Sequence, residues 1–233
     1  MSQVRHRIEQ GGERLWRLND FADFPFNAAA QALSRLTREK TLERLSKGLY
    51  YHNRKTALGK SRPNPAVILK LASQKKTVFP SGIAAANLLG FTTQTTKRTE
   101  VATTALSLPR KLVGRDMLIH TRRPEAWTGI SEEDAALLDF LRHGGKFSEL
   151  SPEETVSKTL ALLSDGGRLK RLLKIARSEP PRVQAMLGAF AERLGTNSKT
   201  LRKLRTSLNP FSRFDFGLLS ALPNAESWQA KKH

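Results

Sequence analysis

The sequence predicts a mostly α-helical α+β protein, and three observations lead to this fold class. Apolar residues recur at helical spacing in several segments, for example at Ala29, Leu33 and Leu36. Serine followed three residues later by an acid indicates helix starts at Ser131 and Ser151. Short runs rich in Thr, Val and Ile, bounded by glycine or proline, predict a few strands. The chain divides into residues 1–62, residues 63–129 and residues 130–233.

Composition limits the classes of function. The 233 residues include 40 Lys and Arg against 21 Asp and Glu, a net charge of +19. The three segments carry net charges of +7, +7 and +5, so the excess is not a basic tail on a neutral body. A surplus of this size predicts a polyanionic partner: nucleic acid first, an anionic membrane surface second and an acidic protein third.

The absence of cysteine excludes disulfides, thiolate catalysis and cysteine metal sites, and it agrees with a cytoplasmic location. The longest apolar stretch, near residues 83–90, is too short to span a bilayer, so no membrane partner is expected. The first residues lack the apolar core of a secretory signal. The five histidines show no ligand spacing, and the sequence predicts no metal and no cofactor.

The first segment predicts a winged helix-turn-helix. Its elements are a helix over residues 4–10 that ends at two glycines, an extended piece at 15–18, a brief helix near 19–24, a helix over 27–39 capped by Asn27, and a hairpin formed by residues 42–45 and 49–51. Three helices followed by a basic hairpin is the order of a winged helix.

The helix over residues 27–39 has a polar face opposite its apolar stripe. That face carries Asn27, Gln31, Ser34 and Arg38, with Arg35 on its flank. Asn, Gln, Ser and Arg are the residue types that read base edges in the major groove of DNA. The adjoining basic residues are expected to contact phosphates: Lys40, Arg44, Lys47, Arg54 and Lys55. The alternative is the solvated face that any small helical domain presents.

The second segment predicts a mixed α/β structure. We expect a helix from Pro65 with Val67, Ile68 and Leu71 on its apolar side. Strands are expected near residues 77–79, 97–104 and 116–121, with an alanine-rich helix over 80–90. Ser81 lacks the G-x-S-x-G pattern of a nucleophile and is interpreted as the cap of that helix.

The third segment predicts helices that start at Ser131 and Ser151, then helices over about 168–177, 183–194 and 199–206. The helix at 168–177 has a basic face formed by Lys170, Arg171, Lys174 and Arg177. That face is either solvated or a second contact for a polyanion or an acidic partner. Phe211, Phe214 and Phe216 in the tail either seal the core or anchor a partner.

Three blocks, taken in order along the chain, resemble a known family. They are Gln31–Leu36 with Leu45–Tyr50, then Pro80-Ser81-Gly82 with Asn87–Gln94, and finally Ser207–Gly217. These blocks resemble those of the AbiEi-type antitoxins of type IV toxin–antitoxin (abortive infection) systems, most closely their shorter relatives.

The resemblance implies an N-terminal DNA-binding domain over residues 1–62 and an antitoxin domain that begins with residues 63–129. It implies that the protein binds double-stranded operator DNA, represses its own operon and counters a nucleotidyltransferase-like toxin, without enzymatic activity. No motif assigns residues to the toxin, and direct contact with it, the operator sequence and the oligomeric state stay open. The alternatives are a stand-alone transcriptional regulator and a metal-dependent nucleic-acid-processing enzyme that uses Glu100 and Asp116.

Overall fold

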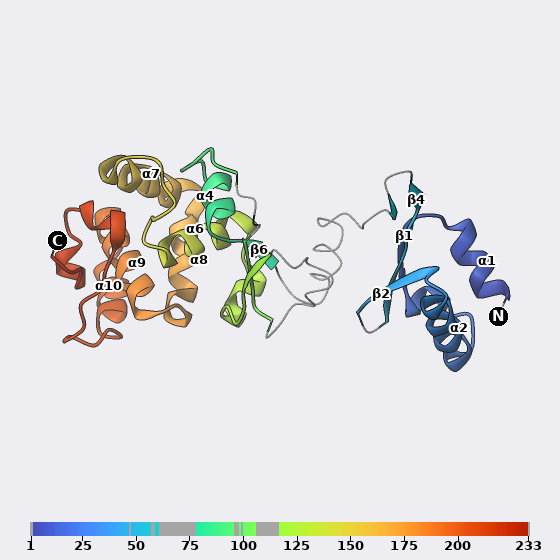
Figure 1. The fold of residues 1–233 in the computed structure, drawn as a ribbon. Helices are drawn as coiled ribbons and strands as arrows, with labels where there is room; N and C mark the ends of the chain where they lie inside the picture. Colours follow the sequence, from blue (N-terminus) through green and yellow to red (C-terminus); the bar gives the residue numbers. More distant parts are fainter. Residues whose placement is uncertain are drawn as a thin grey trace. The chain divides into compact units, whose positions relative to one another are not determined.

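The computed structural model describes residues 2–46, 48–56, 59–60, 78–95, 98, 100–105 and 117–232. The chain divides into two compact units (Figure 1). Unit 1 comprises residues 1–75 and 107–115, and unit 2 comprises residues 76–106 and 116–233. The predicted helix from Pro65 lies outside the described residues. The predicted fold class, mostly α-helical α+β, is confirmed.

Unit 1 has the element order of a winged helix. It contains helix α1 (Ser2–Gln10), strand β1 (Arg14–Arg17), the 3-10 helix η1 (Leu18–Phe21), helix α2 (Phe26–Arg38) and the hairpin of β2 (Leu42–Ser46) and β3 (Leu49–His52). The strands form an antiparallel sheet in the order β1-β3-β2, with Trp16 opposite Tyr50 and Leu42 opposite His52. A second small hairpin, β4 (Lys55–Thr56) with β5 (Gly59–Lys60), was not predicted.

The helices of unit 1 pack on the sheet through one apolar core. Ile8 and Leu33 are fully buried there, and the Trp16 and Phe21 rings lie 5.4 Å apart between centroids. Helix α2 begins one residue earlier than predicted, because Pro25 and not Asn27 occupies its N-cap. The helix ends at Arg38, and two residues later Lys40 has a φ of 59°, the left-handed conformation that usually selects glycine.

Unit 2 joins a small sheet to a helical bundle. Strands β6 (Val78–Pro80), β7 (Glu100–Thr103) and β8 (Leu118–His120) pair in this order, first antiparallel and then parallel. Around them lie α4 (Ile83–Leu88), the 3-10 helix η2 (Glu125–Gly129), α6 (Glu132–Arg142), α7 (Pro152–Ser164), η3 (Asp165–Gly167), α8 (Arg168–Ile175), η4 (Ala176–Ser178), α9 (Pro181–Arg193), α10 (Ser198–Arg205), η5 (Gly217–Ala221) and η6 (Glu226–Trp228). One hydrophobic core joins the described residues of 76–106 and 116–233, so most of the second segment of the sequence forms a single unit with the third. Residues 63–75 and 107–115 of the second segment belong to unit 1.

Several local predictions for unit 2 are confirmed. Ser131 caps α6 by accepting a hydrogen bond from the Asp134 backbone N–H, and Ser151 forms a capping box with Glu154 at the start of α7. The predicted strands correspond to β6, which is shifted by one residue, and to β7 and β8, which have shorter bounds. None of the helices in the described part of the chain is long and apolar enough to cross a membrane.

The tail seals the core, with one exception. Phe216 and Trp228 are buried, and Phe214 packs partly against the same core. Phe211, in contrast, is 92% exposed. Two backbone hydrogen bonds, each 2.8 Å long, join Phe214 to Gln229 and Lys231. Of the three phenylalanines, Phe211 alone presents its ring to solvent.

Candidate nucleic-acid interface

Helix α2 separates its apolar and polar residues as the sequence predicts. Ala29, Ala32, Leu33 and Leu36 are buried in the core of unit 1. The opposite face is exposed to solvent, and it carries Asn27, Gln31, Ser34, Arg35 and Arg38. The structure therefore places these five predicted residues together on one exposed side of a helix that is fixed by its buried side.

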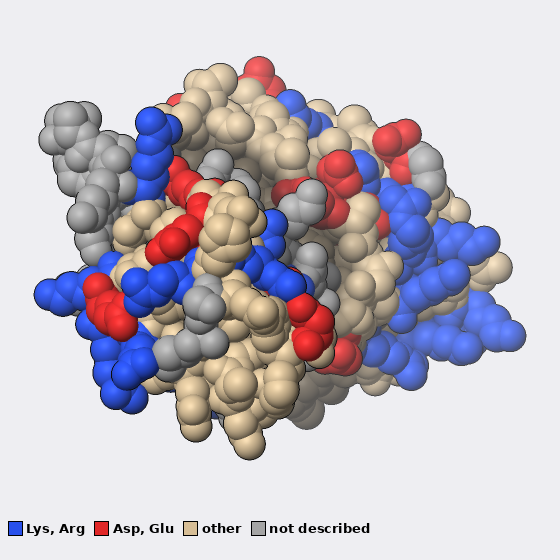
Figure 2. Space-filling model, turned by 90° about the vertical axis from the view of Figure 1, so that its right-hand side faces the viewer, with Lys and Arg blue, Asp and Glu red and all other residues tan. Residues whose placement is uncertain are grey.

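The hairpin next to α2 carries part of the predicted phosphate-contacting set. Lys40, Arg44 and Arg54 are exposed. Lys47 lies outside the described residues, and only the backbone of Lys55 is described, as part of β4. Figure 2 shows that Lys and Arg side chains stand in several groups on the face it presents, with acidic side chains between them.

One residue of this face was missed by the sequence reasoning. Phe26, the first residue of α2, is 69% exposed, an unusual position for a large aromatic side chain. It lies next to Asn27 at the N-terminal end of α2. The available signal was its place directly after Pro25, where helix α2 begins.

The basic face of α8 is exposed at all four predicted positions, Lys170, Arg171, Lys174 and Arg177. One of them, Arg171, also pairs with a buried carboxylate. Its Nε lies 2.8 Å from Oδ2 of Asp134, and Arg168 Nε lies 2.9 Å from Oδ1 of the same residue. Asp134 is fully buried, whereas the Arg171 side chain is 48% exposed, so Arg171 stays on the face while its guanidinium is held by an ion pair.

The prediction that Ser81 caps α4 is wrong. Gly82 occupies the N-cap, and Ser81 is fully buried with its Oγ donating to Oδ2 of Asp139 at 2.9 Å. Glycine is required at position 82, because its φ is +60° and a Cβ there would lie 2.5 Å from Glu100 Oε2. The Pro80-Ser81-Gly82 motif thus brings the chain close to two carboxylates.

Asp139 organises a buried polar cluster in unit 2. Its carboxylate accepts hydrogen bonds from Ser81, from the Gly82 backbone N–H at 2.9 Å and from Arg123 Nη2 at 2.8 Å. His143 Nδ1 lies 3.3 Å from its Oδ2. Burial raises the pKa of Asp139, but the hydrogen bonds and the charges of His143 and Arg123 outweigh burial and lower this pKa below its usual value.

The same interactions act on the two cationic partners of Asp139. The hydrogen bond to Asp139 raises the pKa of His143, against the opposing effect of burial. Burial lowers the pKa of Arg123, and the nearby charge of Arg142 lowers it further. Sequence reasoning missed this cluster. The available signal was a carboxylate at position 139 inside the apolar run of residues 135–141.

The acids of the nuclease alternative do not form a described site. Glu100 pairs with His120, whose Nε2 lies 3.2 Å from Glu100 Oε2, and Asp116 lies outside the described residues. Within the ranges that the structure describes, no three or more His, Asp or Glu side chains are arranged to hold a metal ion.

Unit 1 belongs to the winged-helix class in its order of elements and of strands. Residues 6–124 match the family described as "Family of unknown function (DUF6088)", and because the match covers half of the chain, the protein belongs to this family. The match includes the whole α2 face and all three strands of the unit 2 sheet.

No curated protein matches the chain. Among solved structures, the crystal structure of RV2827C protein from Mycobacterium tuberculosis is similar, with 14% sequence identity and a TM-score of 0.47. The similarity covers 92% of this chain and 84% of that one.

Proposed function

We propose that the protein is a transcriptional regulator that binds double-stranded operator DNA through unit 1. In this proposal α2 lies in the major groove and reads base edges, while the basic residues beside it contact phosphates. The protein acts by binding and not by catalysis. The proposed location is the cytoplasm, where such a regulator meets its DNA.

The exposed face of α2 carries this proposal. Its Asn27, Gln31 and Arg38 side chains are of the types that form bidentate contacts with adenine or guanine. The buried side of the same helix holds these side chains in a constant orientation, since Ala29, Leu33 and neighbouring residues pack in the core. A net charge of +7 over residues 1–62 supplies the sequence-independent attraction to the DNA backbone.

The first turn of α2 supports the same docking. No side chain accepts a hydrogen bond at its N-cap, which is Pro25, so the first backbone N–H groups of this 13-residue helix stay available at its positive end. Helix N-termini of this kind commonly contact a DNA phosphate. Phe26 is exposed at the same end, and its ring is suited to an apolar contact with a thymine methyl group.

The resemblance to AbiEi-type antitoxins extends the proposal. It supports autoregulation of an operon that also encodes a nucleotidyltransferase-like toxin, which this protein counters. The neighbouring open reading frame distinguishes this extended proposal from a stand-alone regulator, because only the antitoxin requires a nucleotidyltransferase-like gene beside its own.

The salt dependence of binding to random-sequence duplex DNA tests the phosphate contacts. We expect log Kobs to fall linearly with log salt concentration, and Arg44→Ala to reduce the magnitude of this slope by about 0.9, the loss of one phosphate contact. Gln31→Ala, which removes no charge, is expected to leave the slope unchanged. Fluorescence anisotropy titrations at several salt concentrations measure both slopes. Equal slopes for the wild type and Arg44→Ala would show that Arg44 of the hairpin does not contact a DNA phosphate.

A further inference from the structure

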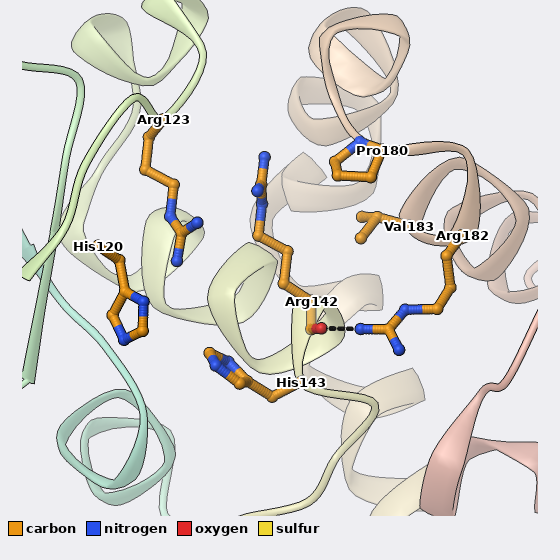
Figure 3. A pocket seen from close by; sticks show the side chains of 7 residues that line it. All are labelled: His120, Arg123, Arg142, His143, Pro180, Arg182 and Val183. Carbon is orange, nitrogen blue, oxygen red and sulfur yellow. Dashed lines mark hydrogen bonds between the residues drawn. The ribbon is translucent and has the colours of Figure 1, made fainter. Parts of the chain in front are cut away.

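Unit 2 contains a pocket whose walls are cationic. Its volume is about 210 Å³. It is lined by His120, Arg123, Arg142, His143, Pro180, Arg182 and Val183. Figure 3 shows His120 and Arg123 on one side of the pocket, with the Arg142 side chain extending away from His143 toward the level of Pro180 and Arg182 approaching from α9. The lining therefore includes three arginines and two histidines, and none of the seven lining residues is acidic.

The acids that balance these arginines lie behind the pocket. Asp139 holds Arg123, and Glu179 accepts a hydrogen bond from Arg142 Nε at 2.8 Å. The side chains of both acids are 0% exposed, so a ligand in the pocket meets the guanidinium groups and not these two carboxylates. A third acid, Glu100, pairs with His120 at 3.2 Å and is not among the lining residues. The carboxylates fix the arginines in place without occupying the side that faces the pocket.

The arginines keep hydrogen-bonding capacity for a ligand. Each carboxylate engages one nitrogen of its arginine among the printed bonds of the described residues, whereas a guanidinium carries five N–H donors. The Nε of Arg123 is buried and has no hydrogen-bond partner, an arrangement that costs free energy. Arg182 donates to the Arg142 carbonyl oxygen at the end of α6, and it forms no ion pair within the described ranges.

The two inner arginines also lie close to each other. The charge of Arg142 lowers the pKa of Arg123, and the guanidinium carbons of Arg123 and Arg142 lie 5.6 Å and 5.4 Å from the centroid of the same Trp127 ring. The two like charges repel each other, and a doubly charged anion placed between them attracts both guanidinium groups and offsets that repulsion. Arginine is the side chain best suited to this task, because its planar fork matches phosphate oxygens.

We propose that this pocket binds a phosphate dianion, either inorganic phosphate or the terminal phosphate group of a mononucleotide. The dianionic group contacts Arg123 and Arg142, with His120 and His143 completing its surroundings. Phosphates of a DNA duplex lie on a broad convex surface, which does not enter a pocket of about 210 Å³, so this ligand is distinct from the proposed operator. All lining residues belong to unit 2, so the outcome of a binding test on this pocket is independent of whether α2 binds DNA.

Isothermal titration calorimetry of the full chain tests the site, with inorganic phosphate, adenosine 5′-monophosphate and adenosine as probes at constant ionic strength. We expect both phosphate-bearing probes to bind with one-to-one stoichiometry and adenosine not to bind. Tighter binding of the nucleotide than of inorganic phosphate identifies a mononucleotide as the ligand class, and equal binding identifies free phosphate. Absence of binding by both phosphate probes would overturn the proposal.

Arg142→Lys is the informative variant. It keeps the charge that pairs with buried Glu179 but loses the planar fork, and we expect phosphate affinity to fall about tenfold. Arg193→Lys, the same substitution at an exposed position of α9 outside the pocket, is the control and is expected to bind as the wild type does. Should Arg142→Lys not fold, as judged by circular dichroism, His120→Gln at the pocket wall takes its place, with weaker binding expected. Wild-type affinity in the folded pocket variant would refute the assignment.

Discussion

Replacing Asp139 with alanine is expected to lower the free energy of unfolding of unit 2 by about 3–5 kcal/mol, the cost of removing one partner of a buried ion pair. The substitution leaves the guanidinium of Arg123, the hydroxyl of Ser81 and the backbone N–H of Gly82 without their shared acceptor. These groups come from the turn between β6 and α4 and from the residues after β8, so the loss affects the junction of the sheet with α6.

Peptide-resolved hydrogen exchange in urea measures this effect, because two units of one chain can unfold separately. The matched control is Glu133→Ala, which removes an exposed carboxylate from the same helix. We expect peptides from α6 to lose protection in Asp139→Ala and to keep it in the control. Comparable protection in both variants would contradict the role assigned to Asp139.

The pKa shifts predict the pH range over which Asp139 and His143 stabilise unit 2. The pKa of His143 is raised by its bond to Asp139, so its contribution is full below its ordinary value of 6.5 and is lost as the pH rises through the folded value. The pKa of Asp139 is lowered, so its contribution is present above 3.8 and is lost as the pH falls through the folded value. The stability difference between wild type and Asp139→Ala should therefore be largest between these two ordinary values.

Trp228→Ala is expected to cost about 3–5 kcal/mol, as is typical for a buried tryptophan. The side chain is 1% exposed and its Nε1 donates to Glu192 Oε2 at 2.9 Å. Its ring lies directly against α9 at Gly188, where a Cβ would come within 2.0 Å of ring atom Cζ3. The ring therefore fills a space that only glycine leaves open.

Phe211→Ala supplies the matched control for this tail. Phe211 is 92% exposed, and its truncation is expected to change the free energy of unfolding by less than about 0.5 kcal/mol. Urea unfolding followed by peptide-resolved hydrogen exchange of α9 measures both variants. A small cost for Trp228→Ala, comparable to that of Phe211→Ala, would show that the tail does not seal the core.

Local features were predictable from the sequence because their causes lie within a few residues. The caps at Ser131 and Ser151 depend on an acid three residues away, and the burial pattern of α2 follows from helical periodicity. The polar cluster was not predictable in this way. Ser81 and Asp139 are 58 positions apart, so only the folded chain reveals that the serine donates to a carboxylate instead of capping a helix.

The same distinction applies to the two predicted surface faces. The α2 face follows from the composition of one helix, and its five polar residues are exposed as predicted. The four basic residues of the α8 face are exposed as well. The ion pair of Arg171 with Asp134 was not predictable, because the carboxylate comes from another helix, 37 positions away. Such a pair offsets part of the positive charge of a surface face without burying its arginine.

Selection of binding sites from a random duplex library tests the proposed function most directly. The account predicts one enriched sequence, to which Gln31→Ala binds about 1–3 kcal/mol more weakly than the wild type, with binding to unselected duplex unchanged. Gln3→Ala, the same substitution at an exposed position of α1, is the control and should bind the selected duplex as the wild type does. Absence of an enriched sequence, or an equal loss on selected and unselected duplex for Gln31→Ala, would contradict a base-reading role for α2.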